Sequence, residues 1–384
     1  MNGFVIDEGG TTALGYYEAA DHIYHVLLAQ AFALSDHHFC SMIGPTLPNR
    51  LYLWSGTSGW DYLQPGDTTS LPYNNPSLTA PPPTLTWPTM ADVVDAAGLP
   101  WKCYSVADGS VPTPIGAFNP LIFFQQMQSS PTKLANATAD ISQFFADLAA
   151  GELPAVSWIV TEAVCCEHPP APPDMGQLLA ARIVDAVINS SAWESTALFL
   201  TYDEGGGYFE HVPPKILEDV PAGLPNGKEA VGPAFRVPLF VVSPWVKPGS
   251  VFKGVTDHTS ILQFIEQNFS TKKNRIKLDT IAPKRRKLDD LREAFDFDQE
   301  PITPSLPTAA QLYPYASDLV LTIDGENTVV DCTTNLPTWL PGLLGVSSSP
   351  GSPTATATPR ASATPTPGTS STPTATPTTT LPTT

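Results

Sequence analysis

The sequence predicts an α/β fold in which a mostly parallel sheet carries helices on both faces. Apolar runs that do not alternate with polar residues are typical of strands buried on both sides. Between these runs lie segments with helical periodicity, and such alternation of strand and helix is the pattern of a parallel sheet. With 384 residues, of which 42% are hydrophobic, the chain is long enough to bury a large core.

Helices are predicted where apolar residues recur at a period near 3.6. In chain order these segments are residues 16–34, 90–97, 142–150, 175–189 and 259–269. Residues 51–54 are the candidate start of a further helix, just after a Pro-rich turn. For the helix at 259–269, Asp257 or Thr259 is the expected N-cap, because both side chains can accept a hydrogen bond from a free backbone N–H.

Strands are predicted where a short apolar run is bounded by turn residues. These runs are residues 39–43, 101–105, 155–160, 197–200 and 238–242. A small hairpin around Asp324 and Gly325 is expected to follow the main sheet, with strands at 319–323 and 328–332.

Composition divides the chain into three parts: a main domain at 1–300, an extension at 301–345 and a tail at 346–384. The tail consists of Ser, Thr, Pro and small residues with a single charge, Arg360, so it cannot bury enough apolar surface to order itself. Repeated Thr-Pro is typical of an O-glycosylated stalk, which predicts a secreted or surface protein, with the tail as a candidate cell-wall attachment. Because residues 1–4 do not resemble an export signal, we expect the chain to lack its true N-terminus.

The net charge of −18 argues against nucleic acid as a partner, because a polyanion is repelled by an acidic surface. One basic run, at 272–287, stands apart from this balance. We expect it to be a solvated surface segment, with binding of anionic head groups or nucleic acid as the alternative.

An acidic pair follows the apolar run at 197–200. Asp203 and Glu204 are followed by three glycines, and His211 lies seven residues after Glu204. Two adjacent acids at the end of a buried strand favour a divalent cation as their partner, and open α/β folds place their chemistry at this end of the sheet. The alternative is a solvated acidic turn.

Four separated motifs occur in one order along the chain. They are Asp36-His-His-Phe-Cys-Ser-Met-Ile-Gly-Pro-Thr46-Leu-Pro-Asn49-Arg50, then Glu167-His168-Pro-Pro, then Asp203-Glu204-Gly-Gly-Gly-Tyr-Phe-Glu-His211-Val-Pro-Pro, and Asp257-His258-Thr-Ser-Ile. Over about residues 3–297 the chain resembles the phosphoesterase family of phosphatidylcholine-preferring phospholipases C and related acid phosphatases. The resemblance implies an alkaline-phosphatase-like α/β fold and a catalytic domain at 1–300.

The resemblance also implies roles for these residues. Thr46 would be the nucleophile, and Asp203, Glu204 and Thr46 would hold a divalent metal ion that activates it. Four histidines would line the phosphate pocket or protonate the leaving oxygen, in the expected order of importance His211 and His258, then His168 and His38. Asn49 and Arg50 would either bind phosphate or cap the turn, and the sequence does not separate these two alternatives.

One part of the family pattern has no counterpart in the sequence. In the family, an acidic residue followed by Asn on the first strand supplies the other half of the metal site. The chain begins downstream of that position, so the expected site is half complete and a central strand is expected to be missing.

The function predicted is therefore a secreted phosphoesterase with phospholipase C-type cleavage of phosphodiesters through Thr46. Its substrate would be a phospholipid or a small phosphate ester, with transient contact to a membrane surface. The alternatives are an acid phosphatase acting on monoesters and an inactive, truncated surface protein that binds phosphate. Trp54, Trp60 and Tyr62 are candidates for a choline-binding cage, and core packing is the competing explanation.

Overall fold

A computed structural model gives the structure of the chain. It describes residues 3–7, 12–19, 21–63, 84–105, 118–161, 165–169, 171, 173–220, 230–309, 311–312, 320–323 and 326–329. The predicted tail at 346–384 and the turn residues Asp324 and Gly325 lie outside this range. Every described helix and strand belongs to one compact unit, which ends at residue 348.

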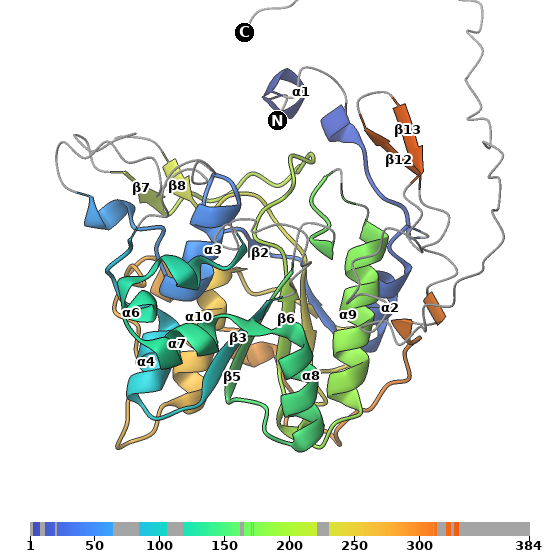
Figure 1. Ribbon diagram of the computed structural model, residues 1–384. Coiled ribbons are helices and arrows are strands. Elements are labelled where there is room, and N and C mark those ends of the chain that lie inside the picture. The colour runs from blue at the N-terminus through green and yellow to red at the C-terminus, as the bar shows by residue number, and fades with distance from the viewer. Residues whose placement is uncertain are drawn as a thin grey trace, which may run out of the picture. The chain divides into compact units, whose positions relative to one another are not determined.

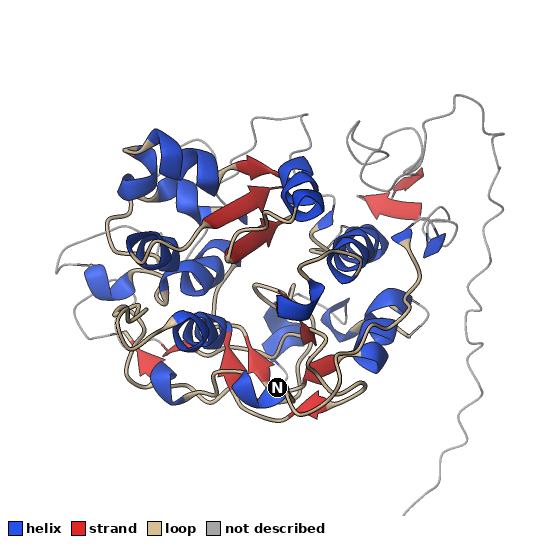
Figure 2. Cartoon of the chain, turned by 90° about the horizontal axis from the view of Figure 1, so that it is seen from below, coloured by secondary structure: helices blue, strands red, loops and turns tan. Residues whose placement is uncertain are grey.

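The helices surround the strands (Figure 1, Figure 2). Those predicted at 90–97, 142–150, 175–189 and 259–269 are present within about two residues of these bounds, whereas the α-helices at 3–7, 125–128 and 131–137 were not predicted. The α-helices are α1 Gly3–Asp7, α2 Ile23–Ala31, α3 Thr46–Ser55, α4 Met90–Ala96, α6 Gln125–Gln128, α7 Pro131–Ala137, α8 Ile141–Ala150, α9 Pro173–Ile188 and α10 His258–Phe269. Short 3-10 helices lie at Thr12–Leu14, Trp60–Tyr62, Pro120–Phe123, Trp193–Ser195, Arg285–Lys287 and Arg292–Ala294. As predicted, Asp257 caps α10, since its side chain accepts a hydrogen bond from the N–H of Thr259.

The strands are short and are distributed over several sheets. They are β1 Ala33–Ser35, β2 His38–Phe39, β3 Trp101–Ser105, β4 Ala139–Asp140, β5 Val156–Val160, β6 Leu198–Thr201, β7 Glu218–Asp219, β8 Ala230–Gly232, β9 Leu239–Val242, β10 Val251–Phe252, β11 Thr256–Asp257, β12 Val320–Ile323 and β13 Glu326–Val329. The strands β12 and β13 pair antiparallel as a hairpin, and the second strand begins at Glu326, two residues before the predicted 328–332.

The α/β class is confirmed, but the parallel pairing is only partly as expected. The sheet β4-β3-β5 is parallel throughout, whereas in the sheet β10-β1-β9-β6 strand β9 runs antiparallel to both of its neighbours. A parallel pair needs a long crossover connection, usually a helix. No described α-helix lies between β6 and β9, so the chain can return beside β6 in the opposite direction.

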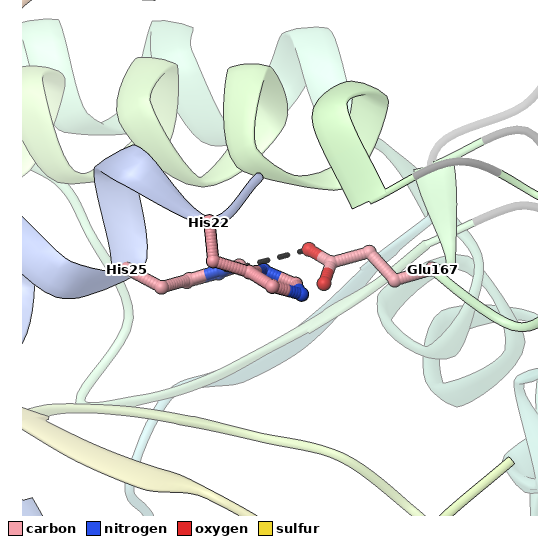
Figure 3. A group of neighbouring side chains, drawn as sticks. All are labelled: His22, His25 and Glu167. Atoms are coloured by element: carbon pink, nitrogen blue, oxygen red, sulfur yellow. Dashed lines mark hydrogen bonds and ion pairs between the residues drawn. The ribbon is translucent and has the colours of Figure 1, made fainter. Parts of the chain in front are cut away.

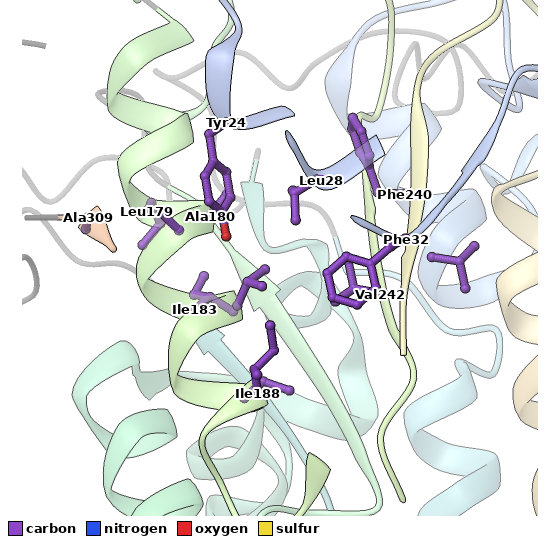
Figure 4. Packing of buried hydrophobic residues seen from close by; sticks show 14 of the residues in the cluster. Tyr24, Leu28, Phe32, Leu179, Ala180, Ile183, Ile188, Phe240, Val242 and Ala309 are labelled. Atoms are coloured by element: carbon purple, nitrogen blue, oxygen red, sulfur yellow. The ribbon is translucent and has the colours of Figure 1, made fainter. Parts of the chain in front are cut away.

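Two hydrophobic clusters cover the two faces of the parallel sheet. One contains residues from α2, α8, α9 and β9, among them Tyr24, Leu28, Ile183 and Phe240 (Figure 4). The other contains residues from α3, α4 and α10 packed on Trp101, Cys103 and Trp158 of the strands. Tyr104 belongs to the first cluster and its neighbour Cys103 to the second, as expected for successive residues of a strand that is buried on both faces.

The helix predicted at 16–34 is too long at both ends. Helix α2 begins at Ile23, and residues 33–35 form β1, which pairs with β9 and β10. Apolar residues such as Ala33 and Leu34 fit both a helix face and a strand, and the two partner strands decide the outcome here.

Candidate active site

The turn that carries Thr46 is held rigidly by its own chain. Thr46 is the first residue of α3, after Pro45 as N-cap, and is 9% exposed. Asn49 is fully buried, and its amide accepts from the N–H of Met42 at 2.8 Å and donates to the carbonyls of Met42, Gly44 and Pro45. Of the two roles left open for Asn49, these contacts match the structural one.

Asp203 and Glu204 follow β6, where the sequence placed them. The side chain of Asp203 accepts from the N–H of Glu204 at 3.0 Å, and that of Glu204 accepts from the N–H of Gly206 at 2.6 Å. Burial, and next to it the charge of Asp203, raises the pKa of Glu204. The pair is therefore a concentration of negative charge that favours a cation.

Arg50 connects the start of α3, which carries Thr46, to the acidic pair that follows β6. Its Nε donates to Oδ2 of Asp203 at 2.7 Å, and its Nη1 donates to the carbonyl of Phe118 at 2.6 Å. Arg50 lies one helical turn after Thr46, so this ion pair fixes the start of α3 against the end of β6.

His38 and His258 form a buried pair behind this ion pair. Their rings are 5.7 Å apart, and both side chains are at most 1% exposed. His258 is hydrogen bonded through Nε2 to the carbonyl of Tyr202 at 2.9 Å, and His38 through Nδ1 to Thr256. Burial lowers the pKa of both imidazoles. Through the His258–Tyr202 hydrogen bond this pair supports the end of β6.

The other two predicted histidines are exposed. His168 has a side chain 54% exposed, and its Nε2 lies 3.6 Å from Oε1 of Glu204, so it faces the acidic pair. The side chain of His211 is 75% exposed and lies 3.3 Å from Oε1 of Glu210. The structure thus brings His168 beside the acidic pair, and the described contact of His211 is with its own neighbour.

Arg285 is a further buried residue that supports the proposed site, although no sequence motif pointed to it. It is fully buried, pairs with Asp257 and with Glu218, and donates to the carbonyl of Ser41 at 2.8 Å. It thereby connects the cap of α10 to the segment before Thr46. The expectation of a solvated run at 272–287 is wrong at this residue, because two buried carboxylates need its charge.

The aromatic residues considered for a choline cage contact other aromatic side chains. Trp54 stacks on Trp158 and is 2% exposed. Tyr62 stacks on Trp87, and Nε1 of Trp60 donates to the hydroxyl of Tyr52 at 3.0 Å. For Trp54 this matches the core-packing explanation, whereas Tyr62 is 42% exposed and its part in a choline cage stays a prediction.

The residues present fit part of a divalent cation site. Asp203 and Glu204 offer adjacent carboxylates that lack a full counter-charge, which is the donor chemistry that hard cations prefer. Within the described residues the positive charge in hydrogen-bond contact with Asp203 is the guanidinium of Arg50. A cation with six or more oxygen ligands needs further donors from outside this set.

A cavity of about 790 Å³ reaches this site from between two sheets. β5 lines one side of it and β6 the other, and Arg50, Asp203 and His258 lie along it. In the described part of the chain β5 pairs with β3 and β6 pairs with β9, so each strand has one unpaired edge. A strand added there would join the two sheets.

Comparison with known proteins identifies the family to which the chain belongs. The Phosphoesterase family model matches residues 1–272. The chain belongs to the phosphoesterase family. It is 34% identical over 333 residues to the non-hemolytic phospholipase C of Pseudomonas aeruginosa, an alignment that covers 78% of this chain and 46% of that protein. It is 33% identical over 279 residues to phospholipase C B of Mycobacterium tuberculosis, with 67% and 52% covered.

The phosphoesterase match confirms the family indicated by the four motifs. The chain spans about half the length of the curated relatives it matches. Among solved structures, a protein of the alkaline phosphatase superfamily from Vibrio parahaemolyticus has a TM-score of 0.37 at 12% identity, with 68% of this chain and 62% of that one covered. That likeness is too weak to add to the family assignment.

Proposed function

We propose that this chain carries the core of a secreted, phospholipase C-type phosphoesterase that cleaves phosphodiesters through Thr46. The observation that carries the proposal is the Arg50–Asp203 ion pair of 2.7 Å, which holds the nucleophile's helix against the acidic pair. The contacts of His168 with Glu204 and of His258 with the carbonyl of Tyr202 support placing the other two motifs at the same site.

The chain's own residues supply most of the chemistry. The Thr46 hydroxyl attacks phosphorus, the bond to the leaving oxygen breaks, and water then hydrolyses the phosphothreonine. Phosphate oxygens bind at the N-terminus of α3, where the helix dipole is positive. His168 protonates the leaving oxygen, because it is the exposed histidine that faces Glu204. His38 and His258 are buried and position the β6 end, and His211 stays a candidate without a contact to the acidic pair.

A divalent cation would be held by Asp203, Glu204 and Thr46, and it would stabilise the negative charge of the alkoxide and of the phosphate. Its remaining ligands would come from a strand in the cavity between β5 and β6, as the family's acidic-Asn motif implies. The unpaired edges of both strands support this proposal.

Contact with a lipid surface is supported by exposed apolar side chains near Glu204. Tyr16 is 82% exposed and Phe209 is 41% exposed. The N–H of Phe209 donates to the carbonyl of Ala13 at 2.8 Å, so the segment after Glu204 lies beside the N-terminal segment. Such side chains suit transient insertion among head groups. No described helix has the length and hydropathy needed to span a membrane. The tail at 346–384 would serve as a stalk or wall attachment.

The test is hydrolysis of a phosphocholine diester, with a phosphate monoester measured in parallel. We expect Thr46→Ala and Asp203→Ala to lose at least about a thousandfold in kcat, as removal of a nucleophile does. Thr46→Ser keeps a hydroxyl and is the matched control. Equal turnover by Thr46→Ala and Thr46→Ser would overturn the mechanism.

The substrate comparison also decides between the alternatives. A preference for the monoester would identify an acid phosphatase. The unpaired strand edges and the partial cation site favour, as a second candidate, a surface protein that binds phosphate without turnover. Phosphate binding without hydrolysis of either ester, by the longest natural form of the chain, would decide for it.

A further inference from the structure

A second cluster of metal-ligand side chains lies apart from the acidic pair, between α2 and the segment before α9. It consists of His22, His25 and Glu167 (Figure 3). Among the described residues, these three offer ligand atoms that all lie within 4.8 Å of one another. Nδ1 of His22 lies 3.2 Å from Nδ1 of His25, and Nε2 of His25 lies 3.6 Å from Oε1 of Glu167.

The backbone around Glu167 is shaped to bring its carboxylate to this point. Glu167 has a φ of 60°, a left-handed conformation that is costly for a residue other than glycine. A Cβ on Gly176 of α9 would come within 2.2 Å of the Glu167 carboxylate, so only glycine leaves room for it. The hydroxyl of Tyr202 donates to Oε2 of Glu167 at 2.6 Å and fixes its orientation.

The imidazole of His25 is equally constrained. Its side chain is 7% exposed, and its ring stacks on Phe240 with centroids 5.4 Å apart. Buried Nε2 has no hydrogen-bond partner within the described residues and points toward Glu167. A buried nitrogen without a partner costs free energy unless a ligand satisfies it.

His25 and Glu167 do not hydrogen bond to each other, because Nε2 of His25 and Oε1 of Glu167 are 3.6 Å apart. Both atoms therefore remain available to a ligand that lies between them. Neutral imidazole and carboxylate are the forms that bind a metal.

We propose that His22, His25 and Glu167 bind a divalent transition-metal ion, with zinc as the best match. Two imidazoles and one carboxylate are an established zinc ligand set that leaves a fourth position open. A zinc ion bound at about 2.1 Å keeps its ligand atoms within roughly 4.2 Å of each other, so small side-chain rotations close the present spread. Imidazole ligands also separate this site from the all-oxygen donors at Asp203 and Glu204.

The bound ion has a structural consequence for the proposed active site. Glu167 precedes His168, which faces Glu204, and Tyr202 precedes Asp203. A metal at this cluster fixes α2, the Glu167–His168 segment and the β6 end relative to one another. It therefore acts as a positioning site, next to the proposed chemistry and outside it.

The experiment is titration of the chelator-treated, full-length chain with Zn(II), and with Co(II) as a spectroscopic probe. We expect Co(II) bound at this cluster to give a spectrum of nitrogen and oxygen ligands, free of a thiolate-to-metal band. Zn(II) should also raise the midpoint of thermal unfolding. Each of His25→Ala and Glu167→Gln should weaken binding by at least about a hundredfold, because loss of a direct ligand exceeds the effect of an outer-sphere partner.

Two control variants make the result specific. His37→Ala removes an exposed histidine that also lies beside a carboxylate, Asp36 at 2.6 Å, and it should leave the affinity unchanged. Asp203→Asn should also leave Zn(II) binding unchanged, while the activity proposed above is lost. Since His25→Ala could fail to fold, His22→Ala at the less buried ligand repeats the test. Wild-type affinity in His22→Ala and Glu167→Gln, a thiolate spectrum, or no binding by the wild type would each overturn the proposal.

Discussion

Two regions of charged and polar side chains meet at the proposed active site, and they differ in the solvent exposure of these side chains. The buried layer consists of the charged side chains of Arg285, Asp257 and Glu218, together with the uncharged imidazoles of His38 and His258. The rim consists of Arg50, Asp203, Glu204 and His168. The side chain of Arg285 is fully buried, whereas those of Arg50 and Asp203 are 13% and 19% exposed and that of His168 is 54% exposed.

This difference in exposure separates charges that have a fixed structural partner from charges whose partner can be exchanged. In the buried layer each charge depends on a fixed partner, because water cannot replace it. At the rim, solvent reaches the charges, so a substrate phosphate or a cation can replace an existing partner. The buried layer therefore determines the positions of the rim residues, and we expect substitutions in the two regions to affect different properties.

The largest effect is expected for Arg285→Ala. It leaves Asp257 and Glu218 buried without their counter-charge, and it removes the link to the carbonyl of Ser41. Removal of one partner from a buried ion pair costs about 3–5 kcal/mol. Chemical denaturation of the purified chain should show this loss in the free energy of unfolding.

Arg292→Ala is the matched control for that measurement. Arg292 pairs with Asp290 through a side chain that is 62% exposed, and such a pair contributes about 0–1 kcal/mol. Similar losses in the two variants would remove the distinction between buried and exposed charges in this part of the molecule.

A second, intermediate effect is expected from pH. The buried imidazoles of His38 and His258 have lowered pKa values in the folded chain, with burial as the main cause. In the unfolded chain they bind protons near pH 6.5. Between the folded and the unfolded pKa values, the unfolded chain binds more protons than the folded chain. The contribution of these histidines to the free energy of unfolding is therefore fully present above about pH 6.5 and decreases as the pH falls below it.

The measurement is the free energy of unfolding between pH 8 and pH 5. Each such histidine contributes up to about 1.4 kcal/mol per pH unit in this window. Glu167, with its raised pKa, acts in the opposite direction between about pH 4.5 and 7, so the difference between variants is the useful quantity. His38→Gln should flatten the slope of the wild type by about one proton. An unchanged slope in His38→Gln would mean that this histidine is protonated in the folded chain.

The two regions also differ in how far the sequence predicted them. Of the rim, Asp203, Glu204, Arg50 and His168 were all named from motifs, because their spacing and residue types are local properties of the sequence. The buried layer was only half recognised. His38 and His258 were expected to line the pocket; His258 lies along the cavity, and both side chains are buried, which the sequence could not show because burial depends on which strands and helices cover a residue.

The sequence did not predict the contacts of Arg285, or those of the cluster of His22, His25 and Glu167, for the same reason. Arg285 lies 67 positions from Glu218 and 28 from Asp257, so no local pattern connects them. His22 and His25 lie in a segment that has helical periodicity, and their third partner is 142 residues from His25 (167 − 25). The longer elements α8, α9, α10, β3, β5, β6 and β9 lie within about two residues of their predicted bounds, because apolar periodicity is local. Helices α1, α6 and α7 and strand β1 were not predicted, and the strand predicted at 39–43 is present only at His38–Phe39, because short elements show too little periodicity. The antiparallel pairing of β9 depended on a connection without a helix.

The smallest effect is expected for Arg50→Met, and it would show whether the rim exchanges partners. Arg50 holds a positive charge 2.7 Å from Asp203, where a divalent cation would also bind. Removal of that charge should strengthen binding of Mn(II) at Asp203 and Glu204 by about tenfold, which corresponds to about 1.4 kcal/mol. Asp203→Asn should abolish this binding, and His22→Ala, in the separate cluster, should leave it unchanged. Weaker Mn(II) binding in Arg50→Met would instead show that Arg50 orients Asp203 for the cation, in which case the rim, like the buried layer, has a fixed arrangement of charges.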